Sequence, residues 1–400
     1  MTRAARRGPR DVSGPAALRP ALVGVGIMLV AFNLRPALTT VGPLLEAIRA
    51  TTGLSTAGAA ILNTLPVLCI GLACALGPVV IRRLGADRGV LLAVAVVALG
   101  SGLRGLGGLA PLFVGACLAA MGIGLAGVLL PGLVKRDFPA RVGLMTGLYT
   151  MVLCLGAAAG AGLSVPLAQS VDGWSPALGL WGVPALVATL AWLPFARSAD
   201  PAAPSVRRPP LWRDTLAWQV TGFMGLQSSL AYIMFGWLPV LLHDRGLSAV
   251  DAGFVASLMS LGQAPAALLV PTLAARARDQ RPFVAGLLAV AVVALLALAI
   301  GPVDLVRPFG MVLGFGIGGL FGLGLTLIVL RARDAAATAS LAAMSQSVGY
   351  TLAALGPLGF GLAHDLTGRW GASVGLFCAI AFGALLFGLG AGRDRKVGGP

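Results

Sequence analysis

The sequence predicts an all-α membrane protein with twelve transmembrane helices, arranged as two six-helix bundles related by pseudo-two-fold symmetry. Three observations support this fold class. First, 58% of the residues are hydrophobic, only 11% are charged and the mean hydropathy is +0.92, whereas about a quarter of the residues of soluble domains are charged. Second, long apolar runs recur along the chain. Third, landmarks of the first half return in the second half.

Each predicted helix is an apolar run near or above the ~20 residues that a helix needs to span a bilayer. The runs cover residues 21–46, 57–81, 89–109, 111–134, 142–169, 175–196, 214–242, 252–275, 282–303, 308–330, 335–363 and 371–391. The connectors hold most of the charged residues and are too short to form soluble domains. The five cysteines fall within the runs and are expected to pack between helices, so we expect no disulfide, metal site or cofactor.

A Pro-rich basic segment, ADPAAPSVRRPP at 199–210, has the composition of a linker and divides the chain into six helices plus six. The predicted parts are an N-terminal tail at 1–20, a first bundle at 21–198, a linker at 199–213, a second bundle at 214–391 and a tail at 392–400.

The two halves also share landmarks at nearly one spacing. The segment GLS at 53–55 returns at 246–248, an offset of 193 residues. The pair Arg-Asp at 136–137 returns at 333–334 with an offset of 197, and Trp174 returns as Trp370 with an offset of 196. Each match occupies the same place relative to the helix count, which predicts a duplicated six-helix unit in parallel orientation.

The positive charge is distributed unequally between the two sides of the predicted membrane protein. All but six of the 29 Lys and Arg residues fall on the side that holds both termini. Because positively charged short loops stay in the cytoplasm, we expect a multi-pass inner-membrane protein with both termini cytoplasmic. The net charge of +15 then reflects insertion and contact with anionic lipid, and no nucleic-acid partner is expected.

The connector after the second run resembles a motif of the major facilitator superfamily, which shares the twelve-helix plan. That loop usually carries Asp-Arg-x-Gly followed by basic residues. Here it contains Arg82, Arg83 and Gly85, followed by Asp87 and Arg88, so Arg-x-Gly is present while Arg82 replaces the acid. The resemblance implies that these residues form a loop that responds to the conformational state.

A closer similarity is to the cyanate and 2-nitroimidazole transporter family. It lies in the segments FNLRPALTTVGPLL (32–45), FMGLQS (223–228), WLPVLLHDRGLS (237–248) and SQSVGYTLAALGPL (345–358). The resemblance implies that the protein transports a small solute by alternating access, in which two halves rock about a central site. It leaves the solute and the direction of transport open.

Glycines are concentrated in the fourth, fifth and tenth runs, at 111–134, 142–169 and 308–330. Small residues let helices approach closely, which serves either static packing or sliding. Because the fourth and tenth runs are equivalent in the repeat, we expect a moving interface there.

Arg35 is the most informative single residue, since it lies within the first run. A charge at such depth costs at least ~3 kcal/mol on insertion scales, and arginine cannot lose its proton. No carboxylate is expected at comparable depth. We therefore predict that Arg35 faces a water-filled cavity between the halves and binds a small polar or anionic solute. The alternative is a structural arginine that caps backbone carbonyls near Pro36.

Other polar residues fall at a similar depth and are candidates for the same site. The repeat supports two of them, because Ser228 follows Arg35 by 193 residues and Gln346 follows Tyr149 by 197. Each residue alone fits an interhelical hydrogen bond equally well, and Asn33 points to a different side from Arg35. The candidates are Asn33, Tyr149, Gln227, Ser228, Tyr232, Gln263, Gln346 and Tyr350.

The sequence gives less information on how transport is coupled to an energy source. Glu46, the only glutamate, lies near the outer end of the first run and is the coupling candidate. Uniport, exchange and proton movement with the solute remain alternatives. We expect a monomer whose partners are a small-molecule substrate and the lipid bilayer.

Two competing functions are less well supported. A multidrug exporter of the same superfamily should have a large aromatic and often acidic cavity, yet the chain has only 15 Phe, 7 Trp and 3 Tyr and the one deep charge is positive. A membrane enzyme would need clustered nucleophiles, bases or metal ligands, which the sequence does not offer.

Overall fold

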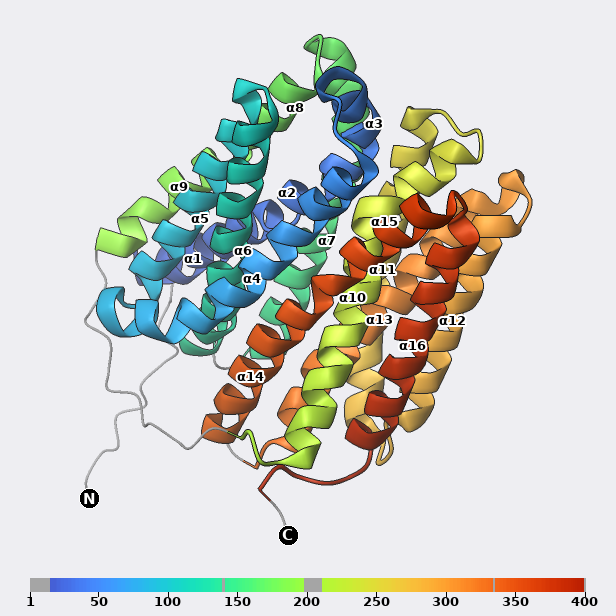
Figure 1. Cartoon of the computed structure of the whole chain (residues 1–400). Helices are drawn as coiled ribbons and strands as arrows, with labels where there is room; N and C mark the ends of the chain where they lie inside the picture. The colour runs from blue at the N-terminus through green and yellow to red at the C-terminus, as the bar shows by residue number, and fades with distance from the viewer. Residues whose placement is uncertain (1–14, 139–140, 198–210, 334, 399–400) are drawn as a thin grey trace, which may run out of the picture.

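The computed structural model describes residues 15–138, 141–197, 211–333 and 335–398, which form helices joined by short turns (Figure 1). Eleven helical segments of this part are long and apolar enough to cross a membrane. The eleventh predicted run, at 335–363, is formed by two shorter helices in succession and is the one that these segments do not include. Most of the predicted linker and N-terminal tail, and Asp334 of the repeat, lie outside the described residues.

The first half contains a three-part first segment followed by five more segments. Its helices are α1 (Pro15–Asn33), α2 (Pro36–Thr39), α3 (Val41–Thr52), α4 (Thr56–Leu84), α5 (Ala86–Leu103), η1 (Arg104–Leu106), α6 (Leu109–Asp137), α7 (Val142–Ser170), α8 (Trp174–Leu180) and α9 (Gly182–Arg197).

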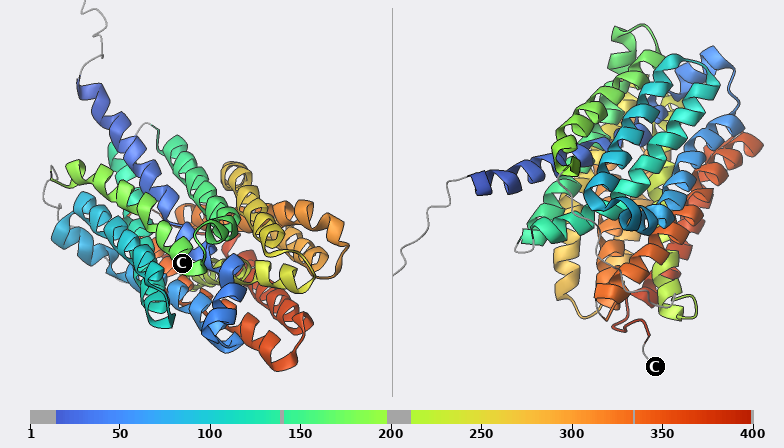
Figure 2. Two further views of the ribbon diagram at one scale, coloured as in Figure 1. Left: turned by 90° about the horizontal axis from the view of Figure 1, so that it is seen from above. Right: turned by 90° about the vertical axis from the view of Figure 1, so that its left-hand side faces the viewer.

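The second half repeats this order. Its helices are α10 (Thr215–Asp244), α11 (Ala249–Arg276), α12 (Arg281–Ile300), η3 (Val303–Leu305), α13 (Val306–Arg331), α14 (Ala335–Ala353), α15 (Leu355–Thr367) and α16 (Trp370–Ala391). Seen along the bundle, the helices of the first half, blue to green, lie beside those of the second, yellow to red (Figure 2).

Prolines explain two breaks that matter for the site. Pro36 follows the turn between α1 and α2 and has no N–H to donate to the carbonyl of Phe32. Pro357 likewise cannot donate to the carbonyl of Ala353, and the chain turns at Ala354 between α14 and α15. The predicted spans at 21–46 and 335–363 therefore contain interruptions that their apolar composition does not reveal.

We call the end of the molecule with the turns at Gly53 and Gly246 the upper end, and the opposite end, where α10 begins and α16 ends, the lower end. The repeated GLS segments adopt the same conformation at the upper end. Gly53 and Gly246 have φ of +69° and +93°, which favours glycine. Ser55 and Ser248 then cap α4 and α11, each accepting a hydrogen bond from a backbone N–H three residues on.

The repeated tryptophans also make equivalent contacts. The indole N–H of Trp174, at the start of α8, donates to the hydroxyl of Thr51 at 2.8 Å. The indole N–H of Trp370, at the start of α16, donates to the carboxylate of Asp244 at 3.0 Å. Thr51 and Asp244 are themselves 193 positions apart. Both tryptophans thus tie the last segment of a half to the upper end of its first segment.

Several glycines of α6 and α13 pack against helices of their own half, and the expectation of a moving interface there remains a prediction. A Cβ at Gly314 or Gly318 of α13 would collide with backbone atoms of α11, and one at Gly122 of α6 would collide with the carbonyl of Ala93 in α5. The halves meet through α7 with α11 and through α4 with α14 and α15. At the first of these contacts, Gly162 of α7 faces Ser257 of α11.

Candidate functional site

A cavity of about 110 Å³ lies between the two halves, near the middle of the spanning helices. The first half lines it with the α1–α2 break, α4, α6 and α7, and the second half with α10, α13 and α14. All three tyrosines of the chain, Tyr149, Tyr232 and Tyr350, line this cavity. Its walls are otherwise mainly apolar, which is typical of small-molecule sites with a few placed polar groups.

Arg35 reaches the cavity from the turn between α1 and α2. Its backbone carbonyl accepts hydrogen bonds from the N–H groups of Leu38 at 2.9 Å and Thr39 at 3.2 Å, which start the short helix α2. On the other side of this break, Gly156 and Gly160 let α7 approach the backbone of α1 and α2 without side chains between them. The break in the helix and the two glycines together fix the backbone position from which the side chain of Arg35 extends.

Two phenylalanine rings from the second half pack on the guanidinium of Arg35. The guanidinium carbon lies 5.1 Å from the ring centroid of Phe235 and 5.6 Å from that of Phe321. Within the described part of the chain, no carboxylate and no hydrogen-bond acceptor pairs with this side chain. The planar N–H groups of Arg35 therefore have no acceptor among the described residues, while the two rings cover part of the charged group.

Five of the predicted site residues come together around this cavity. They are Arg35, Tyr149, Tyr232, Gln346 and Tyr350. The rings of Tyr232 and Tyr350 meet edge to face with centroids 6.2 Å apart. The repeat partners Tyr149 and Gln346 contribute one polar side chain from α7 and one from α14. Whether these residues contact a solute remains a prediction.

Four other predicted residues are buried elsewhere in the bundles. Asn33 donates to the carbonyls of Leu29 at 2.8 Å and Pro184 at 3.2 Å. Gln227 donates to the hydroxyl of Ser228 at 2.7 Å. Gln263 lies on α11 where Gly318 of α13 approaches it. These four residues were predicted at a depth similar to that of Arg35. In the structure, however, their contacts lie within their own half.

Glu46 lies on α3 at the upper end and pairs with a residue of the other half. Its carboxylate oxygen Oε2 is 2.7 Å from Nδ1 of His243 at the end of α10. Close by, Gly42 of α3 lies against the backbone carbonyl of Phe235 in α10. The halves are thus in contact at the upper end, and the role of Glu46 in coupling remains a prediction.

The loop motif at 82–88 is bound to the end of α6. Gly85 makes the turn with φ of +81°, and Arg82 and Arg83 are exposed in the last turn of α4. The carboxylate of Asp87 accepts two hydrogen bonds from Arg136, at 2.6 and 2.9 Å. These bonds, followed by those that Arg136 donates to the carboxylate of Asp137, raise the pKa of Arg136. Asp87 thus has a fixed partner even though Arg82 replaces the usual acid.

Arg104, which falls near the end of the predicted run at 89–109, is fully buried. One of its terminal nitrogens donates to the carbonyl of Ala37 at 3.1 Å and to the hydroxyl of Thr40 at 3.4 Å. Since Ala37 belongs to α2, Arg104 holds the end of the short helix that starts at Arg35. A charge at the end of an apolar run gives no sequence signal of burial, so this residue was missed.

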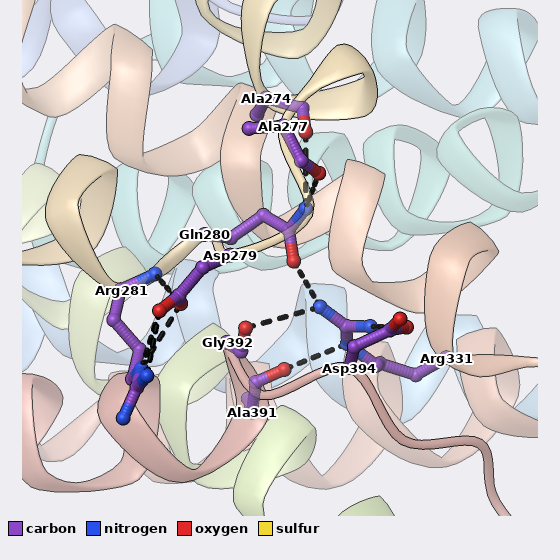
Figure 3. Close-up of polar contacts among 9 residues, drawn as sticks. All are labelled: Ala274, Ala277, Asp279, Gln280, Arg281, Arg331, Ala391, Gly392 and Asp394. Atoms are coloured by element: carbon purple, nitrogen blue, oxygen red, sulfur yellow. Dashed lines mark hydrogen bonds and ion pairs between the residues drawn. The ribbon is translucent and has the colours of Figure 1, made fainter.

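Arg331, which directly follows the predicted run at 308–330, is buried at the lower end of α13 and makes the contacts drawn in Figure 3. It donates to the carbonyl of Ala391 at 2.8 Å and of Gly392 at 3.2 Å, and to the side chain of Gln280. Gln280 follows Asp87 by 193 positions, so each half has an arginine bound to this equivalent place. Nearby, hydrogen bonds from Arg281 lower the pKa of Asp279 to about 2.

Comparison with known proteins gives a consistent result. The family model described as Major Facilitator Superfamily matches residues 27–357. The chain is 40% identical to the uncharacterized transporter YycB of Bacillus subtilis (strain 168), over 93% of this chain and 94% of that protein. It is 38% identical to the 2-nitroimidazole transporter of Escherichia coli (strain K12), over 84% of this chain and 86% of the relative.

Two further matches extend this comparison. The chain is 32% identical to the cyanate transport protein CynX of Escherichia coli (strain K12), over 78% of this chain and 82% of the relative. Its fold matches the crystal structure of a bacterial homologue of the human lysosomal transporter Spinster, with a TM-score of 0.68 and 15% identity, covering 95% of this chain and 94% of that one.

Proposed function

Because this chain belongs to the Major Facilitator Superfamily of membrane transporters, we propose that it carries a small anionic or nitro-bearing organic solute by alternating access. In this proposal Arg35 binds the solute through the in-plane N–H groups of its guanidinium. The observation that carries it is an intramembrane arginine, unpaired among the described residues, on the wall of a cavity between the halves.

The size of the cavity supports a small solute. An engineered cavity of about 150 Å³ holds one benzene molecule, so the 110 Å³ found here suits a solute no larger than a single small ring. A carboxylate, a nitro group or a linear anion matches the planar donors of arginine. The multidrug alternative needs a larger cavity than this one.

The tyrosines complete the proposed site. Tyr149 from the first half and Tyr350 from the second place phenol groups on the same cavity wall as Arg35. Phenol groups are both donors and acceptors, so they suit the polar edge of a heterocycle as well as an anion. A solute held by both halves at once would couple its binding to their relative movement.

The lower end is proposed to face the cytoplasm. The Arg-rich turns at 82–88 and 276–281 lie there, and positive short loops are retained in the cytoplasm. With the halves in contact at the upper end, the solute would then exchange with the cytoplasmic side in this state.

The test is uptake by proteoliposomes of purified protein, with cyanate and 2-nitroimidazole as the first probes because relatives carry those names. Arg35→Gln should raise the half-saturating concentration by about ten- to a hundredfold, since a hydrogen bond to a charged group contributes about 1.5–3 kcal/mol. Arg35→Lys keeps the charge but loses the planar set of donors. Its half-saturating concentration should therefore lie between those of the unmodified protein and Arg35→Gln.

One control variant and one contrary outcome define what the uptake experiment can show. Arg307→Gln removes an exposed arginine of α13 that pairs with Asp251, and it should leave uptake unchanged. A probe that enters at the same half-saturating concentration with Arg35→Gln as with the unmodified protein would remove Arg35 from the binding site.

A further inference from the structure

A second cavity, of about 20 Å³, lies between the halves on the upper side of the Arg35 cavity. It shares two wall residues with the larger cavity, Leu38 and Tyr232. On α4 its wall residue Asn63 lies about two helical turns above Ile70, which lines the larger cavity. The two cavities are therefore successive spaces along one path, separated by Leu38 and Tyr232.

The small cavity contains a hydrogen-bond donor without a partner. The amide nitrogen Nδ2 of Asn63 is buried and bonds to no acceptor in the part of the chain that the structure describes. A buried polar group in this condition is costly, so such groups normally hold a ligand or an ordered water. A space above ~10–15 Å³ is enough for one water molecule, and this cavity exceeds that size.

Two prolines leave acceptors at the same place. Pro66 of α4 has no N–H for the carbonyl of Leu62, and Pro239 of α10 has none for the carbonyl of Phe235. Leu62 and Phe235 both belong to the wall of the small cavity. One helix from each half therefore has a carbonyl without its helical donor at a residue that lines the same cavity as Asn63.

Glycine keeps this space free. A Cβ at Gly236 of α10 would lie 2.7 Å from Cγ of Asn63, so a side chain there would displace the Asn63 amide. Gly236 belongs to the second half and Asn63 to the first, so the cavity lies in the interface between them. When the halves part at the upper end, it must widen.

We propose that Asn63 is a second solute-contact residue, which donates a hydrogen bond to an oxygen or other acceptor atom of the solute as it passes between Arg35 and the upper opening. In the closed upper state the same amide holds one water molecule. This inference rests on the proposed function, because it assigns a second solute contact on the upper side of Arg35. It predicts that Asn63 matters for one side of the membrane only.

The first experiment measures transport separately from each side, in proteoliposomes whose orientation is fixed, with cyanate and 2-nitroimidazole as probes. Asn63→Leu should raise the half-saturating concentration about tenfold for entry from the upper side and leave it within about twofold for entry from the lower side. Asn63→Ser keeps a small donor and should restore part of the loss.

The matched control is Thr64→Val. The hydroxyl of Thr64 is also buried and without a partner among the described residues, but Thr64 does not line the cavity. Its loss should change neither side. An equal effect of Asn63→Leu on both sides, or the same one-sided effect in Thr64→Val, would overturn the proposal.

The second experiment keeps the two proposals distinguishable. If the unmodified protein moves neither probe, the proposed function fails for these solutes, while the water site at Asn63 is still tested by a high-resolution structure. That structure should contain an ordered water bonded to Nδ2 of Asn63, and Gly236→Ala should expel it. Density without a water at Asn63 in the unmodified protein would refute the site itself.

Discussion

Nδ1 of His243 lies 2.7 Å from a carboxylate oxygen of Glu46, so a single polar contact joins α10 to α3 across the two halves at the upper end. Both side chains are substantially exposed, at 37% and 65%. The contact therefore contributes little to stability, and we expect it to break when the halves part at the upper end. A weak contact of this kind can shift the equilibrium between the states that are closed and open at the upper end, although it contributes little to the stability of the fold.

Glu46→Gln should populate the state that is open at the upper end more than the unmodified protein does. Exposed ion pairs contribute about 0.2–1 kcal/mol, which corresponds to a shift of up to about fivefold. Spin labels on α3 and α10 would report it as a longer distance. His243→Asn should have the same effect, and the double variant should add nothing. Asp251→Asn, which breaks an exposed pair inside the second half, is the control.

The same variant tests the coupling hypothesis for Glu46. If Glu46 carries the proton, uptake driven by a pH gradient should disappear in Glu46→Gln while exchange of solute without a gradient continues. Proteoliposomes with an imposed pH gradient provide the measurement. An equal response to the gradient in both proteins would eliminate Glu46 as the proton site.

Arg104→Met should weaken solute binding more than it weakens the fold. It releases the carbonyl of Ala37 and with it the helix that starts at Arg35, so we expect an increase of about tenfold in the half-saturating concentration. The unfolding temperature should change little, because a buried arginine with two unpaired nitrogens is itself costly. Arg331→Met should do the opposite, since Arg331 binds several acceptors far from α2. Unchanged affinity in Arg104→Met would contradict this.

Gly156→Ala should destabilise the first half. The new Cβ would collide with the carbonyl of Phe32 at the break before Arg35, and overpacking of this kind costs about 1–3 kcal/mol. Thermal unfolding in detergent measures the loss. At Gly132 of α6 a Cβ meets no described atom within 4 Å, so Gly132→Ala should leave stability equal or slightly higher. Similar unfolding temperatures for both variants would show that α7 can yield.

Arg136→Gln should lower stability by about 1 kcal/mol, since its bonds to Asp87 are lost at a partly exposed site. The raised pKa of Arg136 fixes the pH dependence. A raised pKa gives a contribution that is fully present below the pKa of arginine in the unfolded chain and is lost only above its pKa in the folded protein. The difference between the two proteins should therefore stay constant from about pH 6 to pH 10 in denaturation experiments.

The apolar runs and the duplication were readable from the sequence because both are linear patterns. Each of the twelve predicted runs coincides with helical segments, and the GLS and tryptophan matches have the same contacts in both halves. The interruption at Ala354 was not readable, since it follows from one proline inside a continuous apolar run.

The site was readable only in part. Depth along the helix placed Arg35, Tyr149 and Tyr350 at a common level, and all three line the cavity. Depth could not say which face a residue occupies, so Gln263, which lies inside its bundle, was indistinguishable from cavity residues. For Asn33 the helical spacing already predicted a side different from that of Arg35, and its hydrogen bonds lie within the first half. Asn63 was missed because one amide near the end of an apolar run has no pattern around it.

The tight backbone contacts at Gly314 and Gly122 have a mechanical consequence. Neighbouring helices inside each half lie too close there to admit even a methyl group, so we expect each half to move as one block. The energy difference between its orientations then depends on the side chains that meet where α7 packs on α11 and α4 packs on α14 and α15. Substituting those side chains can favour one orientation without destabilising either half. The interface between the halves is therefore where substitutions should trap single states for structure determination.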